Sequence, residues 1–72
     1  MSISAGEKIR LVLRRRGMTI TQLAERMKTS RQNISNKLAR DNFTEQELRA
    51  FCDALECDCD IVLTLRDSGD QI

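Results

Sequence analysis

The stretch MTITQLAERMKTSRQNISNKL, residues 18–38, contains two helical patterns that are separated by a short turn. Thr19 and Gln22 have the spacing of a capping box, in which each side chain binds the backbone N–H group of the other residue at the start of a helix. The second pattern begins after Ser30, a residue type that is favoured at the N-cap. The spacing predicts two helices joined by a three-residue turn, over about residues 20–27 and 31–40.

The second of these helices combines two apolar positions with a polar remainder. Ile34 and Leu38 are four residues apart, so they lie on one face and can dock the helix. The other positions hold amide, hydroxyl and cationic side chains, and no acidic residue occurs between Glu25 and Asp41. Arg can bind guanine in the major groove of DNA, and Gln or Asn can bind adenine. The two segments therefore predict a helix-turn-helix whose residues 31–40 read the major groove.

Further elements are expected on both sides of this pair. Capping-box patterns predict helices over about residues 5–16 and 45–56. From Cys57 to Arg66 apolar residues alternate with mainly polar ones, which is typical of a strand with one apolar face. We therefore expect a single, mainly α domain over residues 1–72, with a four-helix bundle over 5–56, a C-terminal β-strand over 57–66 and a tail over 67–72.

The expected strand needs a partner, because a lone strand leaves its backbone unpaired and its apolar face exposed. Within the chain only residues 2–4 could pair with it, and they are few. We expect two copies to pair antiparallel across a two-fold axis, with Ile61, Leu63 and Leu65 at the dimer interface. A homodimer would also stabilise a short chain with a small core, and it would space two recognition helices about 34–36 Å apart.

Charge is divided unevenly along the chain. Residues 1–40 have ten basic and two acidic side chains, a net charge of +8, whereas residues 41–72 have two basic and nine acidic ones, a net charge of −7. A basic half suits a polyanion such as DNA, because Lys and Arg release the counterions of its phosphates. A solvated, dipolar surface would have the same composition. Three consecutive arginines, Arg14 to Arg16, can instead interact with the C-terminal dipole of their own helix.

Several classes of function find no support in the residues. The chain has no His, no Gly-rich phosphate loop and no Ser or Cys beside an evident base, so we expect neither an enzyme nor a cofactor. Cys52, Cys57 and Cys59 lack the number and spacing of a zinc site, and we expect no metal. An odd number of cysteines fits a reducing cytoplasm. No apolar run approaches the roughly 20 residues of a membrane span, and the start of the chain does not read as a signal peptide.

Residues 18–38 resemble the helix-turn-helix of the phage repressor and Cro-type (XRE-like) family. The pair Leu23-Ala24, and Ile34 ten residues after the alanine, stand where that family places them, and the likeness extends over residues 5–56. The resemblance implies a lambda-repressor-like fold with base contacts from Arg31, Gln32 and Asn36. It implies phosphate contacts from polar residues near the two helices, which are Thr19, Thr21, Gln22, Ser30, Lys37, Arg40 and Asn42.

Two positions depart from the family pattern. Lys28 occupies the turn where the family usually has glycine, and Lys37 stands where many members have an apolar residue. The leading hypothesis is a prokaryotic or phage transcriptional regulator that binds double-stranded DNA as a dimeric repressor in the cytoplasm, associated with the nucleoid. One alternative is a DNA-binding antitoxin or accessory protein whose acidic half binds a protein partner. The other is an interaction module that lacks DNA binding.

Overall fold

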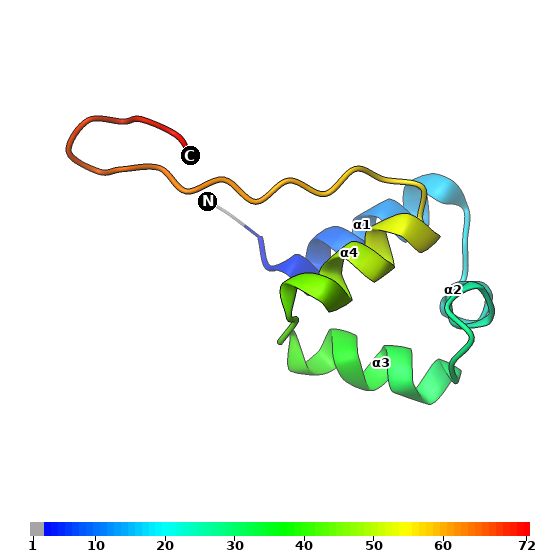
Figure 1. The fold of residues 1–72 in the computed structure, drawn as a ribbon. Coiled ribbons are helices and arrows are strands. Elements are labelled where there is room, and N and C mark those ends of the chain that lie inside the picture. The colour runs from blue at the N-terminus through cyan, green and yellow to red at the C-terminus, as the bar shows by residue number, and fades with distance from the viewer. Residues whose placement is uncertain (1–2) are drawn as a thin grey trace.

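A computed structural model describes residues 3–72, which form four α-helices followed by an extended C-terminal segment (Figure 1). The helices are α1 (Ala5–Arg16), α2 (Ile20–Arg26), α3 (Arg31–Arg40) and α4 (Glu45–Ala54). The mainly helical fold class and the four expected helices are confirmed. The helix α2 ends one residue before the expected residue 27, and α4 ends two residues before the expected residue 56. No helix among the described residues has the length and hydropathy needed to cross a bilayer.

Each helix begins at a Ser or Thr whose side-chain oxygen accepts a hydrogen bond from the backbone N–H group three residues on. At Thr19 and Thr44 the capping box is complete, and the Gln or Glu side chain returns a bond of 2.9 Å in each. At Ser4 only the serine's half of the expected box is formed within residues 3–72. Loss of an N-cap side chain costs about 1 kcal/mol, so these local bonds fix where the helices start.

The core is aliphatic with a single buried aromatic ring. Ile34 and Leu38 of α3 are both buried, as expected from their spacing. Phe43 packs edge-on against the buried Phe51 of α4, with ring centroids 5.4 Å apart. The buried hydrophobic residues of the described chain are Ile9, Leu13, Leu23, Ala24, Ile34, Leu38, Phe51 and Leu55. One small core therefore joins all four helices.

The end of α3 is tied to the start of α1. Asp41, which follows α3, has a left-handed backbone with φ of 54°. Its carboxylate accepts a hydrogen bond of 2.7 Å from the backbone N–H of Gly6 in the first turn of α1. A Cβ atom at Gly6 would lie 3.0 Å from both Asp41 Oδ1 and the carbonyl oxygen of Leu38. This close approach requires glycine, and it places a negative charge at the positive end of the α1 dipole.

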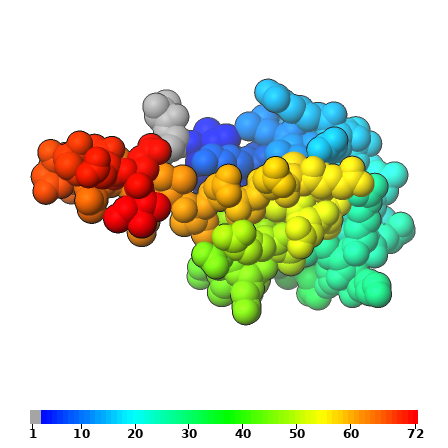
Figure 2. Space-filling view, turned by 45° about the horizontal axis from the view of Figure 1, so that its top comes forward, coloured from blue at the N-terminus to red at the C-terminus, as the bar shows by residue number. Residues whose placement is uncertain are grey.

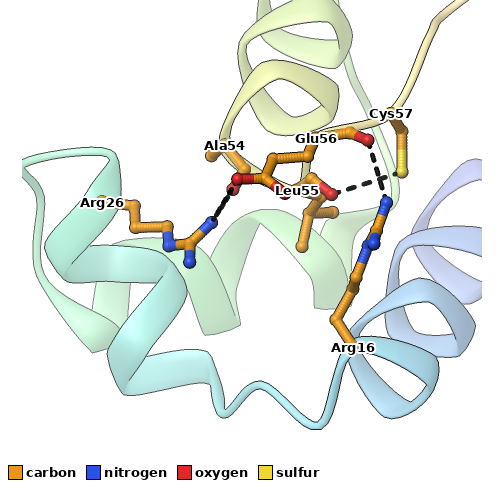
Figure 3. A network of polar contacts seen from close by, with 6 residues as sticks. All are labelled: Arg16, Arg26, Ala54, Leu55, Glu56 and Cys57. Atoms are coloured by element: carbon orange, nitrogen blue, oxygen red, sulfur yellow. Dashed lines mark hydrogen bonds and ion pairs between the residues drawn. The ribbon is translucent and has the colours of Figure 1, made fainter.

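Two arginines hold the C-terminal end of α4 against the rest of the bundle (Figure 3). Arg16, at the end of α1, donates to the carbonyl oxygen of Glu56 over 2.9 Å. Arg26, at the end of α2, donates to the carbonyl oxygen of Ala54 over 2.9 Å, and its guanidinium lies 3.9 Å from the Glu56 carboxylate. Carbonyl groups at a helix end have no partner within the helix. Arg26 therefore caps α4, and Arg16 binds the chain two residues beyond the end of this helix.

The prediction of a β-strand over residues 57–66 is wrong. This segment is extended, but the residues that the structure describes contain no named strand and only one isolated antiparallel bridge, between Thr64 and Gln71. The physical reason is that a strand requires a ladder of hydrogen bonds to a neighbour, which alternation of apolar residues does not supply. The sequence also offered residues 2–4 as a possible partner of this segment, and Ser2 among them lies outside the described residues.

Residues 63–72 fold back on themselves, and we call them the C-terminal hairpin. Leu63 and Ile72 exchange two backbone hydrogen bonds of 3.1 and 2.8 Å, and Leu65 N–H donates to the carbonyl oxygen of Asp70 over 2.8 Å. The turn ends at Gly69, whose φ of 79° suits glycine. Figure 2 shows that the hairpin projects from the helical body, and the whole molecule measures 43 × 23 × 22 Å.

Candidate nucleic-acid interface

The turn between α2 and α3 closes α2 with a Schellman motif. Thr29 N–H donates to the carbonyl oxygen of Ala24 over 2.9 Å, and Lys28 N–H donates to that of Glu25 over 3.2 Å. Lys28 takes the left-handed conformation that this motif needs, with φ of 56°. A lysine adopts it at a cost of about 1 kcal/mol relative to glycine. The turn keeps its geometry although the residue that usually forms it is absent.

Close packing fixes the angle between the two helices. Ala24 of α2 is 3% exposed, and its small side chain allows α3 to approach. Ile34 and Leu38 are buried on the inner side of α3, and Leu23 of α2 is fully buried beside them in the core. The outer side of α3 is thereby held in a defined position relative to α2.

The three residues for which base contacts were expected all belong to α3 and lie outside the core. Arg31, Gln32 and Asn36 are all exposed. Gln32 Nε2 donates a hydrogen bond of 2.9 Å to Asn36 Oδ1, as residues four apart on one helical face can do. Arg31 makes no hydrogen bond or ion pair to the part of the chain that is described. The structure thus exposes a guanidinium at the start of α3 and two linked amides on one face of this helix.

Two other polar side chains of α3 are turned toward the protein. Lys37 is half-buried, forms an ion pair with Glu47 of α4 and lies 6.0 Å from the centre of the Phe43 ring. The hydrogen bond from Lys37, followed by the one from the backbone of Thr44, lowers the pKa of Glu47 below its ordinary value of 4.5. Asn33 Nδ2 donates to Thr29 Oγ1 over 3.0 Å. Lys37, expected at a phosphate, is therefore engaged with α4.

Several of the residues expected at phosphates form helix caps. The hydroxyl oxygens of Thr19 and Ser30 accept bonds of 3.1 Å from backbone N–H groups. Accepting a bond leaves the O–H donor of each hydroxyl unused, and Gln22, which accepts through Oε1, keeps its NH₂ donors. These groups can therefore cap a helix and donate to a phosphate oxygen at once. The remaining candidates, Thr21, Arg40 and Asn42, are exposed.

Two contacts that support this interface could not be predicted from the sequence, because the residues that form them are far apart along the chain. The local sequence pattern places Glu47 in a capping box with Thr44, but Glu47 also forms an ion pair with Lys37, ten residues earlier. Arg26 acts on Ala54 across 28 residues of sequence. No local pattern indicates either contact, because each depends on how α4 packs against the helix-turn-helix.

Comparison with known protein families gives one clear result. A family model described as the Cro/C1-type HTH DNA-binding domain matches residues 8–65. The chain belongs to this family. Curated proteins gave no match, and solved structures gave none either.

The family assignment agrees with the geometry. It confirms the resemblance of residues 18–38 to a Cro-type helix-turn-helix, and α2 and α3 form that motif in the structure. The matched range also includes α4 and most of the extended segment 57–66. The chain is therefore a DNA-binding regulator of the Cro/C1 class.

Proposed function

We propose that this protein is a sequence-specific transcriptional repressor that occupies an operator and inserts α3 into the major groove of duplex DNA. The observation that supports this proposal is that α3 exposes the side chains of Arg31, Gln32 and Asn36 while it buries Ile34 and Leu38. A recognition helix needs a buried side that docks it and a polar side that meets base edges. α3 has both.

The hydrogen bond between Gln32 and Asn36 bears on which bases are read. Gln32 donates through Nε2, so its Oε1 atom and its second N–H remain available. That acceptor and donor match N6 and N7 of adenine. Arg31 has the donor pair that matches O6 and N7 of guanine. We therefore propose a half-site that contains a guanine and an adenine contacted by Arg31 and Gln32.

Backbone contacts would position α3 over these bases. We propose phosphate contacts for Thr19, Thr21, Gln22, Ser30, Lys37, Arg40 and Asn42. The exposure of Arg40 in the last turn of α3 supports its role, since its side chain is free of the ion pairs found in residues 3–72. Lys37 would have to leave Glu47 to reach a phosphate. Arg40 is consequently the better supported of the two cations.

We also propose that the repressor is a homodimer whose interface includes Ile61, Leu63 and Leu65. Their side chains are 47, 67 and 45% exposed. Contiguous apolar side chains at the surface of a small protein favour burial against a partner. A two-fold dimer would present two copies of α3 to two half-sites about one helical turn of DNA apart.

Selection of bound sites from a random duplex library tests the function directly. We expect an inverted repeat with half-site centres about 10 base pairs apart, and affinity for it should fall steeply as salt rises. Absence of binding to any duplex at low salt would overturn the proposed function. Enrichment of unpaired half-sites would contradict the homodimer and leave DNA reading by α3 in place.

A further inference from the structure

The extended segment before the hairpin turn uses only one of its two backbone edges. Leu63 and Leu65 direct their hydrogen bonds toward the returning residues 70–72. Successive residues of an extended chain direct their N–H and C=O groups to opposite edges. The groups of Val62 and Thr64 therefore point to the other edge, and neither residue makes a backbone hydrogen bond within residues 3–72. Such an edge is a template for another extended chain.

The side chains along this segment divide between two faces. Ile61, Leu63 and Leu65 project from one face, because side chains alternate along an extended chain. Val62 and Thr64 project from the other, and all five are exposed. Asp60 and Arg66 lie at the two ends of the segment and share the face of Val62 and Thr64. A negative charge at one end and a positive charge at the other make the segment complementary to an antiparallel copy of itself.

We infer that two copies of this chain pair antiparallel along the free edge, with Val62 of one copy opposite Thr64 of the other. This inference rests on the homodimer proposed above and specifies its register. Leu63 then meets Leu63 of the second copy at the two-fold axis, and Ile61 lies opposite Leu65. Asp60 of each copy lies opposite Arg66 of the other. Opposite charges placed directly across two strands stabilise the pairing.

The two neighbouring registers that use the same edge are poorer. With Thr64 on the axis, Asp60 lies opposite Ser68 and Arg66 lies opposite Val62, so neither charge has a partner. With Val62 on the axis, Arg66 would have to meet Asp58. Asp58 precedes Cys59, whose carbonyl oxygen accepts a hydrogen bond of 3.1 Å from Arg49 of α4. The chain there is held beside α4, so pairing stops before Asp58.

Charge reversal tests the register in the full-length protein. Asp60→Lys should weaken dimerisation by about 2- to 30-fold, because two cross-strand attractions become repulsions. Arg66→Glu should do the same, and the double variant should restore the affinity between copies. Asp53→Lys changes the net charge equally but lies on α4, so it should leave dimerisation unchanged. Sedimentation equilibrium gives the dissociation constants, and failure of the double variant to recover would overturn the register.

Disulfide trapping provides an independent readout. In a background with Cys52, Cys57 and Cys59 changed to Ala, Leu63→Cys should form a disulfide-linked dimer on mild oxidation, because directly opposed residues of this type have Cα atoms about 4.5 Å apart. Val62→Cys and Thr64→Cys are matched controls that should remain unlinked. Preferential linking of either control would show a neighbouring register and overturn the inference, with the dimer intact. If light scattering shows a monomer, both the register and the homodimer are overturned. DNA binding by α3 is tested by a separate measurement, so its outcome is distinguishable from these.

Discussion

Lys37 of the recognition helix forms an ion pair with Glu47 in the first turn of α4. The side chain of Glu47 also accepts a hydrogen bond of 2.9 Å from the backbone of Thr44, so one carboxylate holds α3 and caps α4. The ammonium group lies 6.0 Å from the centre of the Phe43 ring, in the connection between the two helices. The charge of Glu47 therefore helps to hold α3 against α4, beside the buried contacts of the core.

Lowering the pH should remove this link. The folded state depresses the pKa of Glu47 below its ordinary value of 4.5, so the stabilisation is complete above that value and is lost as the pH falls through the lower, folded-state pKa. Glu47→Gln should make the unfolding free energy depend less on pH in this acid range. Urea titrations between pH 3 and 7 measure it, with Glu45→Gln as the control on the same turn. Equal pH profiles for wild type and Glu47→Gln would refute the assignment.

Gly6 should resist replacement by alanine although it lies in a helix. Gly to Ala usually stabilises an exposed helical site by about 1 kcal/mol. Here the added Cβ atom would lie 3.0 Å from the Leu38 carbonyl oxygen and from Asp41 Oδ1. Gly6→Ala should therefore destabilise the fold by about 1–3 kcal/mol, as measured by chemical denaturation. In Asp41→Ala the clash with the carboxylate is absent, so a smaller effect of Gly6→Ala in that background is expected, and purely additive effects would argue against the contact.

Arg31 and Arg40 should affect DNA binding differently. Arg31→Ala should lower discrimination at one base pair by about 1–3 kcal/mol, whereas Arg40→Ala should weaken binding to all sequences and reduce the salt slope by about one. Arg31→Lys is the informative control, because it keeps the charge and loses the bidentate fork. Fluorescence anisotropy against the selected site and a scrambled duplex, over a range of salt, separates the outcomes. Equal losses on both duplexes for Arg31→Ala would mean that Arg31 contacts phosphate.

Arg16 and Arg26 should contribute to stability through α4. Each donates a hydrogen bond of 2.9 Å to a carbonyl oxygen at or just beyond the end of that helix. Arg26→Ala and Arg16→Ala should each lower the unfolding free energy by about 1 kcal/mol. Arg15→Ala is the matched control, since Arg15 is exposed, and surface changes of this kind stay within about 0.5 kcal/mol. Thermal unfolding followed by circular dichroism compares the three variants.

The starts of the helices could be predicted from the sequence because their causes are local. Thr19 with Gln22, and Thr44 with Glu47, satisfy each other across three residues, so the pattern contains both partners of the bond. The buried side of α3 was predictable for the same reason, since the spacing of Ile34 and Leu38 alone defines it. The contact of Asp41 with Gly6 spans 35 residues and has no such signature.

The C-terminal segment shows where periodicity misleads. Alternation from Cys57 correctly indicated an extended chain, but it contained no information about a neighbour, and residues 67–72 were expected to be a tail. The hydrogen bonds between Leu63 and Ile72 depend on a reversal that ends at Gly69. A turn sequence of Asp67, Ser68 and Gly69 was the available signal. The direction of Lys37 was equally hidden, because a lysine can lie along either face of a helix until its partner is known.

The left-handed backbone at Lys28 links two properties that are usually adjusted separately. A glycine there would relieve the conformational cost of the turn, yet it would also delete a cation from the loop that leads into α3. Engineering for thermal robustness and engineering for attraction to a polyanion therefore compete at this single residue. In a domain this small, the residue that adds conformational strain to the turn also strengthens the electric field felt by an approaching duplex.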